Sequence, residues 1–94
     1  MNRLHTLHIL NKTPDHPRFS ECLGTLGPDD AVALTENGVL GLVASKAFSS
    51  VQTYALEGDL NARGLSDDNL GAAAPIDYSE LVNLTLQAER VISW

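Results

Sequence analysis

Short apolar runs alternate with longer mixed segments along this chain, and this alternation constrains its fold more than any other feature. The runs at residues 4–10, 31–34 and 51–56 have the length and the apolar or β-branched content of strands. The segments between them are long enough to hold helices and loops. Strands that alternate with helical segments are typical of successive βα units, so we expect an α/β fold with a mostly parallel sheet.

Two helices are predicted from their end signals. Pro17 suits the first turn of a helix, because the N–H it lacks has no partner there, and Gly27-Pro28 would end that helix with a C′ glycine and a breaker. Asp77, with Glu80 three residues later, resembles a capping box at the start of the second helix. The apolar stripes of the two helices are Phe19, Cys22, Leu23 and Leu26, and Leu81, Leu84, Thr85 and Ala88.

The remaining elements are shorter. Residues 57–63 predict a helix that has acidic residues in its first turn and Gly64 as its C′ residue. Residues 66–74 are polar and then rich in glycine and alanine, which indicates a flexible surface loop. Residues 74–76 enter a short strand or extended piece, and residues 91–94 can add a final edge strand.

The Asn37-Gly38 pair allows two structures. Between apolar flanks, Asn-Gly is the strongest local signal for a two-residue β-hairpin. Alternatively, Asn37 caps a helix whose apolar side chains, from Val39 to Ala47, cover most of its surface. A helix of that kind in so small a chain needs cover on more than one side, which indicates contact with another subunit. The residues alone leave both structures open.

Length, charge and hydropathy exclude several classes of protein. Of the 94 residues, 44% are hydrophobic, so we expect residues 1–94 to form a single domain with its own core. The net charge of −6 disfavours direct nucleic-acid binding, because Lys and Arg supply the affinity for phosphate and only six are present, without a cluster. No stretch approaches the roughly 20 apolar residues of a membrane span, and no signal peptide is recognised. We therefore expect a cytoplasmic protein without membrane contact.

Cys22 is the only cysteine, which excludes an internal disulfide and a Cys-based metal site within one chain. A reactive thiolate needs a helix N-terminus or nearby cations, and Cys22 lies roughly in the second turn of its predicted helix, too far in for the full benefit of the terminal N–H groups. Its place in the apolar stripe favours a packing or interfacial thiol. A reactive thiol remains the alternative.

No metal and no cofactor are expected. His5 and His8 are three residues apart, so on a strand they would point to opposite faces, and His16 lies in a separate loop. The sequence also lacks the common nucleotide-binding and hydrolase motifs. In parallel sheets, sites form in the loops beyond the carboxyl ends of the strands. The candidate loops by that rule are residues 11–19, 35–38 and 56–59.

Several stretches, taken together and in order, resemble the TusB/DsrH family of sulfur-relay subunits. The most specific is Tyr54-Ala55-Leu56 followed by residues 59–65. The others are Leu4-His5-Thr6-Leu7, Cys22-Leu23, residues 30–34, Asn37-Gly38-Val39 (where the family usually has Asp-Gly-Val), Ile76-Asp77-Tyr78, residues 81–85 and Ser93-Trp94. They cover essentially the whole chain.

This resemblance implies a three-layer α/β/α domain of the DsrE/DsrF/DsrH type and a helix, not a hairpin, after Asn37-Gly38. It implies assembly with TusC-like and TusD-like subunits into a heterohexamer, a dimer of heterotrimers, in which residues 39–48 take part in subunit contact. Such a complex takes persulfide sulfur from a TusA-like donor. It passes the sulfur, through a TusE-like acceptor, towards 2-thiouridine at the tRNA wobble position.

The resemblance assigns the main sulfur-carrying cysteine to the TusD-like subunit, so this chain is expected to be a non-catalytic subunit. Cys22 matches a cysteine of DsrH-like members that some TusB proteins lack, which makes it a candidate auxiliary persulfide carrier. Two alternatives stay open. One is a DsrH-like role in dissimilatory sulfur oxidation, and the other is a stand-alone thiol enzyme or redox sensor that acts through Cys22.

Overall fold

The strands form one parallel sheet. A computed structural model describes residues 4–44, 48 and 51–94. Their five strands lie in the order β4-β3-β2-β1-β5, and each of the four pairings is parallel. The strands are β1 (Thr6–Leu10), β2 (Ala31–Leu34), β3 (Gln52–Leu56), β4 (Ala74–Ile76) and β5 (Arg90–Ser93). The predicted α/β fold with a parallel sheet is therefore confirmed.

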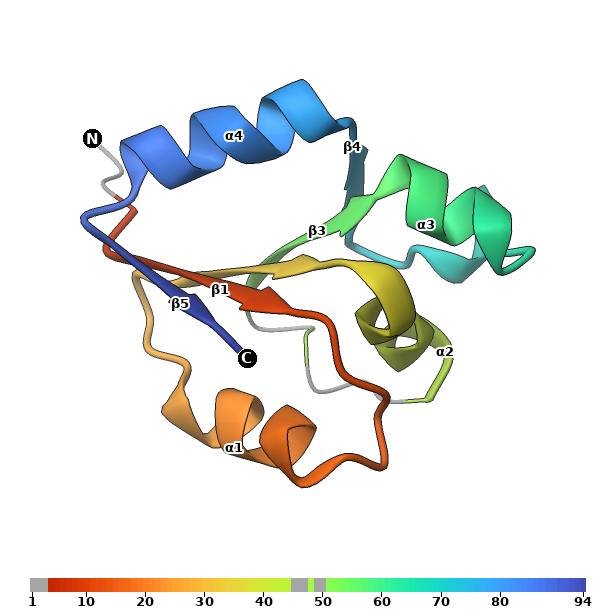
Figure 1. Ribbon diagram of the computed structural model, residues 1–94, viewed down its shortest axis with the longest axis horizontal. Coiled ribbons are helices and arrows are strands. Elements are labelled where there is room, and N and C mark those ends of the chain that lie inside the picture. Colours follow the sequence, from red (N-terminus) through yellow and green to blue (C-terminus); the bar gives the residue numbers. More distant parts are fainter. Residues whose placement is uncertain (1–3, 45–47, 49–50) are drawn as a thin grey trace.

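Helices lie on both faces of this sheet (Figure 1). The helical elements are α1 (Pro17–Thr25), η1 (Glu36–Leu40, a 3₁₀ helix), α2 (Gly41–Ala44), α3 (Glu57–Ala62), η2 (Asp67–Asn69, also 3₁₀) and α4 (Tyr78–Gln87). From β1 to β4 the chain crosses the sheet in one direction, and it then returns to the far side of β1 for β5. Because parallel crossovers are right-handed, this reversal places α4 on the face opposite α1 and α2.

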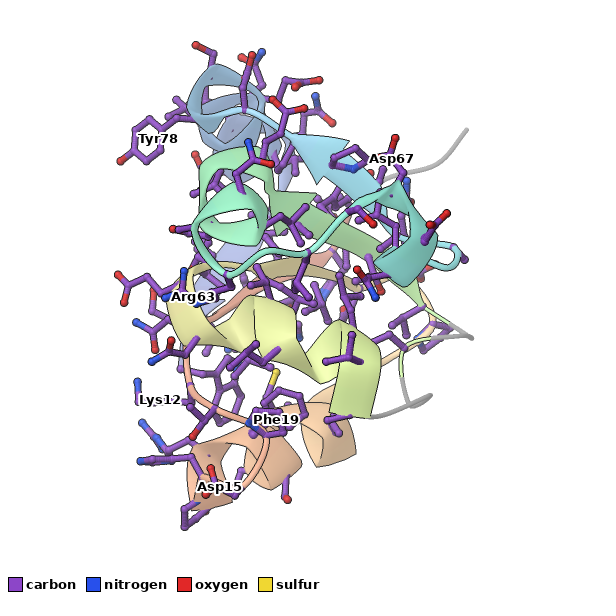
Figure 2. All side chains as sticks on the ribbon, turned by 90° about the vertical axis from the view of Figure 1, so that its right-hand side faces the viewer. Lys12, Asp15, Phe19, Arg63, Asp67 and Tyr78 are labelled. Carbon is purple, nitrogen blue, oxygen red and sulfur yellow. The ribbon has the colours of Figure 1, made fainter. Side chains whose placement is uncertain are left out.

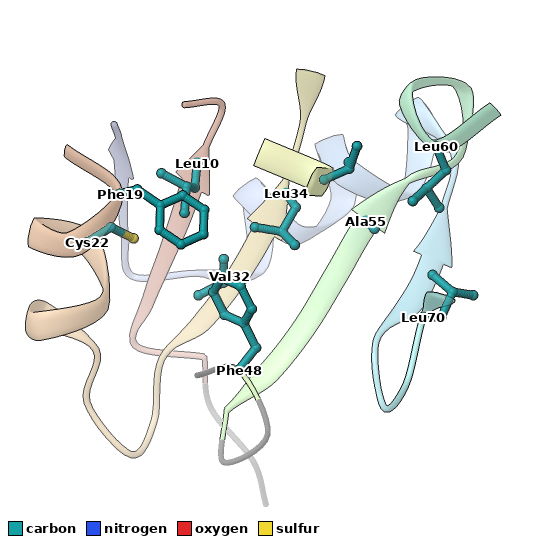
Figure 3. Packing of buried hydrophobic residues seen from close by; sticks show 10 residues of the cluster. Leu10, Phe19, Cys22, Val32, Leu34, Phe48, Ala55, Leu60 and Leu70 are labelled. Atoms are coloured by element: carbon teal, nitrogen blue, oxygen red, sulfur yellow. The ribbon is translucent and has the colours of Figure 1, made fainter. Parts of the chain in front are cut away.

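The larger core cluster lies between the sheet and the α1 side, and Figure 3 shows it closely. Its fully packed members are Leu10, Phe19, Cys22, Val32, Leu34, Val39, Phe48, Ala55, Leu60 and Leu70. Phe19 of α1 and Phe48 meet edge to face, with ring centroids 5.8 Å apart. That geometry is one that aromatic pairs prefer. The pair ties α1 to the segment that leads into β3.

The other core cluster depends on one helix. Its buried members are Leu7, Ala31, Ala33, Ile76, Leu81 and Leu84. Among the described residues, all of its buried helical members come from α4, and the partly buried Ala88 is the C-cap of that helix. The α4 face of the sheet therefore has less cover than the α1 face.

The predicted helix starts are confirmed. At α4, Asp77 Oδ1 accepts a hydrogen bond from the Glu80 backbone N–H (2.8 Å), and Glu80 Oε1 accepts one from the Asp77 N–H (2.9 Å). α1 begins at Pro17, with His16 as its N-cap. α1 stops at Thr25 with Leu26 as its C-cap, so Gly27 is the C′ residue as predicted, although the described glycines with positive φ are elsewhere. One of these is Gly64, which has φ 69° just after α3, as predicted.

Asn37-Gly38 lies in a helix and not in a hairpin, which confirms the structure that the family resemblance implies. The chain turns after β2 into η1, whose N-cap is Thr35 and not Asn37. The left-handed residue is Glu36, with φ 49°. Gly38 is buried against β1, where an added Cβ would lie 2.0 Å from the Leu10 carbonyl oxygen. Only glycine lets η1 approach the end of β1 so closely.

Two segments differ in detail from their predictions. Val39 and Phe48 of the apolar 39–48 segment are buried in the chain's own core, whereas Val43 is 55% exposed. Residues 45–47 lie outside the described residues, and contact of this segment with another subunit stays a prediction. The loop at residues 66–74 contains the η2 turn, and its Leu70 is buried in the core, so it is more ordered than its composition indicated. No described helix has the length and apolar content needed to cross a bilayer.

Candidate functional site

Trp94 occupies the point at which ligands commonly bind in open parallel sheets. The strand order reverses at β1, which lies between β2 and β5, and ligand sites form at such switch points, beyond the carboxyl ends of the strands. Here the Trp94 N–H donates to the Ile9 carbonyl (2.9 Å), and Lys12 Nζ donates to the Trp94 carbonyl oxygen (2.6 Å). The Arg18 guanidinium lies 5.4 Å from the centroid of the indole ring. The chain thus fills this crevice with its own side chain.

A buried hydrogen-bond chain extends from Trp94 to the opposite end of the sheet. Trp94 Nε1 donates to His8 Nδ1 at 3.0 Å. Because an indole N–H is only a donor, Nδ1 must be the acceptor, so His8 Nε2 carries the hydrogen and donates to Asp30 Oδ2 at 2.9 Å. His8 is 1% exposed, and Asp30 Oδ2 also accepts from the Gly27 N–H at 2.9 Å. The side chains of Trp94, His8 and Asp30 therefore all have hydrogen-bond partners within the fold.

This environment lowers the pKa of Asp30. Burial by itself would raise the pKa, but hydrogen bonds from His8 and from the Gly27 backbone outweigh it, together with attraction to the His8 and His5 rings. The carboxylate is therefore the form that the fold stabilises.

The histidines do not lie as the strand pattern predicted. His5 Nδ1 lies 3.7 Å from Asp30 Oδ1, so His5 and His8 both approach one carboxylate, and the prediction that they point to opposite faces is wrong. The physical reason is that His5 precedes β1, where the alternation of a strand does not apply. His16 is separate and caps α1, accepting from the Arg18 N–H at 3.0 Å. Within the described residues, no three His, Cys, Asp or Glu side chains are placed to hold a metal ion.

A pocket of about 420 Å³ opens at the amino ends of the strands, between β1, the loop before β2 and β5. His5, Thr6, Asp30 and Arg90 are among its polar lining residues. It lies at the end of the sheet opposite the predicted loops.

Two of the three predicted loops are joined at the carboxyl edge. The Glu36 N–H donates to Asp59 Oδ2 at 2.6 Å, which links η1 to the first turn of α3. Arg63 Nε and Nη2 donate to Asn37 Oδ1 at 3.1 and 2.9 Å. Figure 2 shows the Lys12 and Arg63 side chains at the same side of the molecule. Arg63 and Trp94 were not predicted as site residues, because nothing in the neighbouring sequence shows which loop each side chain reaches.

Cys22 is fully buried. Its side chain points from α1 towards the sheet, into the cluster that contains Leu10 and Phe19 (Figure 3). Burial raises the pKa of the thiol to about 12. This environment favours the packing interpretation of Cys22, because among the described residues neither a helix N-terminus nor a cation stabilises the thiolate. A carrier role would require α1 to move away from the sheet.

We expect Cys22 to resist alkylation in the folded protein. With a pKa of about 12, only about a few thiols in 10⁵ are ionised at pH 7.5, and burial excludes the reagent as well. Iodoacetamide labelling followed by mass spectrometry should show no adduct until urea is added. A Ser20→Cys variant, which places a thiol at an exposed position of the same helix, should be labelled readily. Fast labelling of wild-type Cys22 would restore the thiol-enzyme alternative.

These features define a small parallel α/β domain. Its own Trp94 fills the switch point of the sheet, and its only cysteine, Cys22, is buried in the core. Residues 12–91 match the family described as DsrH like protein. The chain is 32% identical to Protein TusB of Shigella flexneri and 31% identical to Protein TusB of Pectobacterium parmentieri, in both cases over 94% of this chain and 99% of the relative. The chain therefore belongs to the TusB/DsrH family.

A solved structure agrees with this assignment. The solution NMR structure of protein Tm0979 from Thermotoga maritima superposes with a TM-score of 0.68 at 26% identity, covering 86% of this chain and 91% of that one. Both the family resemblance and the fold class that the sequence indicated are confirmed.

Proposed function

We propose that this chain is a non-catalytic subunit of a sulfur-relay complex that serves tRNA thiolation. The observation that carries the proposal is the similarity to TusB proteins along 99% of their length. The burial of Cys22 supports the non-catalytic role. Since it is the only thiol in the chain, a partner protein must supply the exposed cysteine that carries persulfide sulfur.

The proposed partners are TusC-like and TusD-like subunits, in a dimer of heterotrimers. The complex receives sulfur from a TusA-like donor and passes it to a TusE-like acceptor, towards 2-thiouridine at the wobble position. Exposed apolar side chains on α2 and α4, among them Val43 (55% exposed) and Leu86 (77%), support contact with other chains. The net charge of −6 supports proteins, and not tRNA, as the direct partners.

The test is deletion of the gene for this chain in the organism that encodes it. Mass spectrometry of digested tRNA should show loss of wobble 2-thiouridine, and a plasmid copy should restore it. A Cys22→Ser copy should restore it equally, because the proposal assigns the sulfur chemistry to a partner. Co-expression with the TusC-like and TusD-like chains should yield a stable complex. Unchanged 2-thiouridine would contradict the proposal, and a loss of sulfur oxidation instead would support the DsrH-like alternative.

Cys22 is the one residue at which this chain can itself carry sulfur. In that auxiliary step its thiolate would attack the terminal sulfur of a donor persulfide, forming a new S–S bond on Cys22 and releasing the donor cysteine as a thiolate. Mass spectrometry of the assembled complex after exposure to the donor tests the step. A gain of one sulfur atom on Cys22 supports the auxiliary transfer step. If Cys22 stays unmodified while a partner cysteine is persulfidated, the role of Cys22 is packing alone.

A further inference from the structure

The pocket at the amino ends of the strands is built on one face of the sheet. In the parallel register of β1 and β5, which Figure 1 shows side by side, Thr6 pairs with Arg90 and His8 pairs with Ile92. Paired residues lie on the same face, so these four side chains form the floor of the pocket. The loop of residues 27–30 lines its wall. The pocket, of about 420 Å³, therefore combines segments that are far apart in the sequence.

One oxygen of the Asp30 carboxylate has no donor in this pocket. The Asp30 side chain is only 10% exposed, and its Oδ2 accepts the hydrogen bonds from His8 Nε2 and from the Gly27 N–H. Its Oδ1 accepts none from any described residue, since His5 Nδ1 lies 3.7 Å away, beyond hydrogen-bonding distance. Because each carboxylate oxygen accepts hydrogen bonds, Oδ1 is a largely buried acceptor open to a donor from a ligand.

The negative charge of Asp30 also lacks a permanent cation. Within the described residues, no Lys or Arg side chain forms an ion pair with it. His8 accepts from the Trp94 indole at Nδ1 and donates through Nε2, so its ring is neutral. A carboxylate that is taken out of water without a cationic partner is costly. An ammonium group at Oδ1 would supply both the missing hydrogen bond and the missing charge.

Arg90 offers the opposite charge in the same pocket. Its guanidinium has no hydrogen bond or ion pair with any residue that the structure describes. A free guanidinium fits a carboxylate well, because its N–H groups match the two oxygens. Pro28 and Ile92 add apolar lining for a short carbon chain. From this we propose that the pocket binds a small amino acid, with its ammonium group on Asp30 Oδ1 and its carboxylate on Arg90. This site is independent of the proposed function.

An NMR titration of the ¹⁵N-labelled full-length chain tests the site. The ligands are glycine, β-alanine and γ-aminobutyrate, which differ in the separation of their two charged groups. At least one should shift the amide signals of Gly27, Asp30 and Arg90 in a saturable way, with a dissociation constant of about 0.1 to 10 mM for so small a molecule. The absence of saturable shifts with all three would overturn the proposal.

Two ligands that carry one charged group each test whether both contacts are needed. Ethylamine and propionate should each bind at least about tenfold more weakly than the best amino acid, because each loses one charge-assisted contact. If ethylamine binds as tightly, the pocket takes an ammonium group alone, such as that of a protein lysine. That result would overturn the role of Arg90 and with it the amino-acid proposal.

Asp30→Asn tests the acceptor. The amide oxygen can keep the hydrogen bonds from His8 and Gly27, while the NH₂ group takes the place of Oδ1. The variant should therefore fold but bind the amino acid at least about tenfold more weakly. Asp29→Asn is the matched control, since it makes the same change at an exposed residue that also lines the pocket, and its affinity should stay within about twofold. Wild-type affinity of Asp30→Asn would overturn the site.

Arg90→Gln tests the other half of the ligand. It should weaken binding of the amino acid by about tenfold and leave the binding of ethylamine unchanged, because ethylamine has no carboxylate. Arg90 is exposed, so this variant does not depend on the buried hydrogen bonds of Asp30. Circular dichroism checks that each variant is folded. Unchanged amino-acid affinity of Arg90→Gln would overturn the proposal.

Discussion

Gly38→Ala is expected to destabilise this protein by at least about 3 kcal/mol. An alanine Cβ at this position would lie 2.0 Å from the carbonyl oxygen of Leu10 and 2.9 Å from its carbonyl carbon. These atoms belong to the backbone of β1, so no side-chain rotation relieves the overlap. Either η1 or the end of the central strand β1 must move. Urea unfolding should show a large fall in the midpoint with a similar m-value.

Gly58→Ala is the matched control. Gly58 lies in α3, and nothing lies within 4 Å of the Cβ it would gain. Because alanine has the higher helix propensity, this change should be neutral or stabilising by up to about 1 kcal/mol. If Gly38→Ala and Gly58→Ala unfold at the same urea concentration, η1 does not approach the backbone of β1 as closely as described here.

Asp30→Ala is expected to cost about 3 kcal/mol. The change leaves the N–H of His8 Nε2 and the Gly27 backbone N–H without their acceptor, and His8 is buried. Donors left unpaired in the interior are costlier than the net value of the bonds themselves. Asp29→Ala removes the same charge from the neighbouring exposed position and should change stability by less than about 0.5 kcal/mol.

The Asp30 contribution should depend on pH. Since the pKa of Asp30 is lower in the folded chain than in the unfolded one, the unfolded state binds more protons between those two values. The stabilisation is therefore complete above about pH 4 and is lost as the pH falls through the folded pKa. The difference in unfolding free energy between the wild type and Asp30→Ala should shrink as the pH is lowered from 6 to 3. A constant difference would show that the Asp30 carboxylate is not the stabilised species.

Local sequence signals predicted an element correctly wherever residues within or next to that element define it. Asp77 and Glu80 form the predicted capping box, Pro17 starts α1 as predicted, and Gly64 has the expected left-handed conformation. In each case the interaction joins residues only a few positions apart. The apolar run at β2 was predictable in the same way, since a strand buried on both faces needs apolar residues throughout.

Local sequence signals could not predict features that depend on a contact between segments far apart in the sequence. Asn37-Gly38 is compatible with a hairpin or a helix, and the carbonyl of Leu10, far away in the sequence, requires glycine in the helical turn. His8, Asp30 and Trp94 are separated by tens of residues and meet only because β1 pairs with β2 on one side and with β5 on the other. Sequence spacing could not show that the histidines share one carboxylate.

The amino-acid sequence by itself determined the α/β class, the positions of most elements, the TusB/DsrH family and the membership of Cys22 in an apolar stripe. The fold class, the elements and the apolar stripe follow from periodicity and from interactions between near neighbours, whereas the family follows from the resemblance of several stretches in order. The tertiary structure decided that Trp94 fills the switch point, that Asp30 is held as a carboxylate and that the outer apolar side chains of α4 stay exposed. Each depends on the order of strands in the sheet, since the return of the chain from β4 to β5 places both α4 and Trp94.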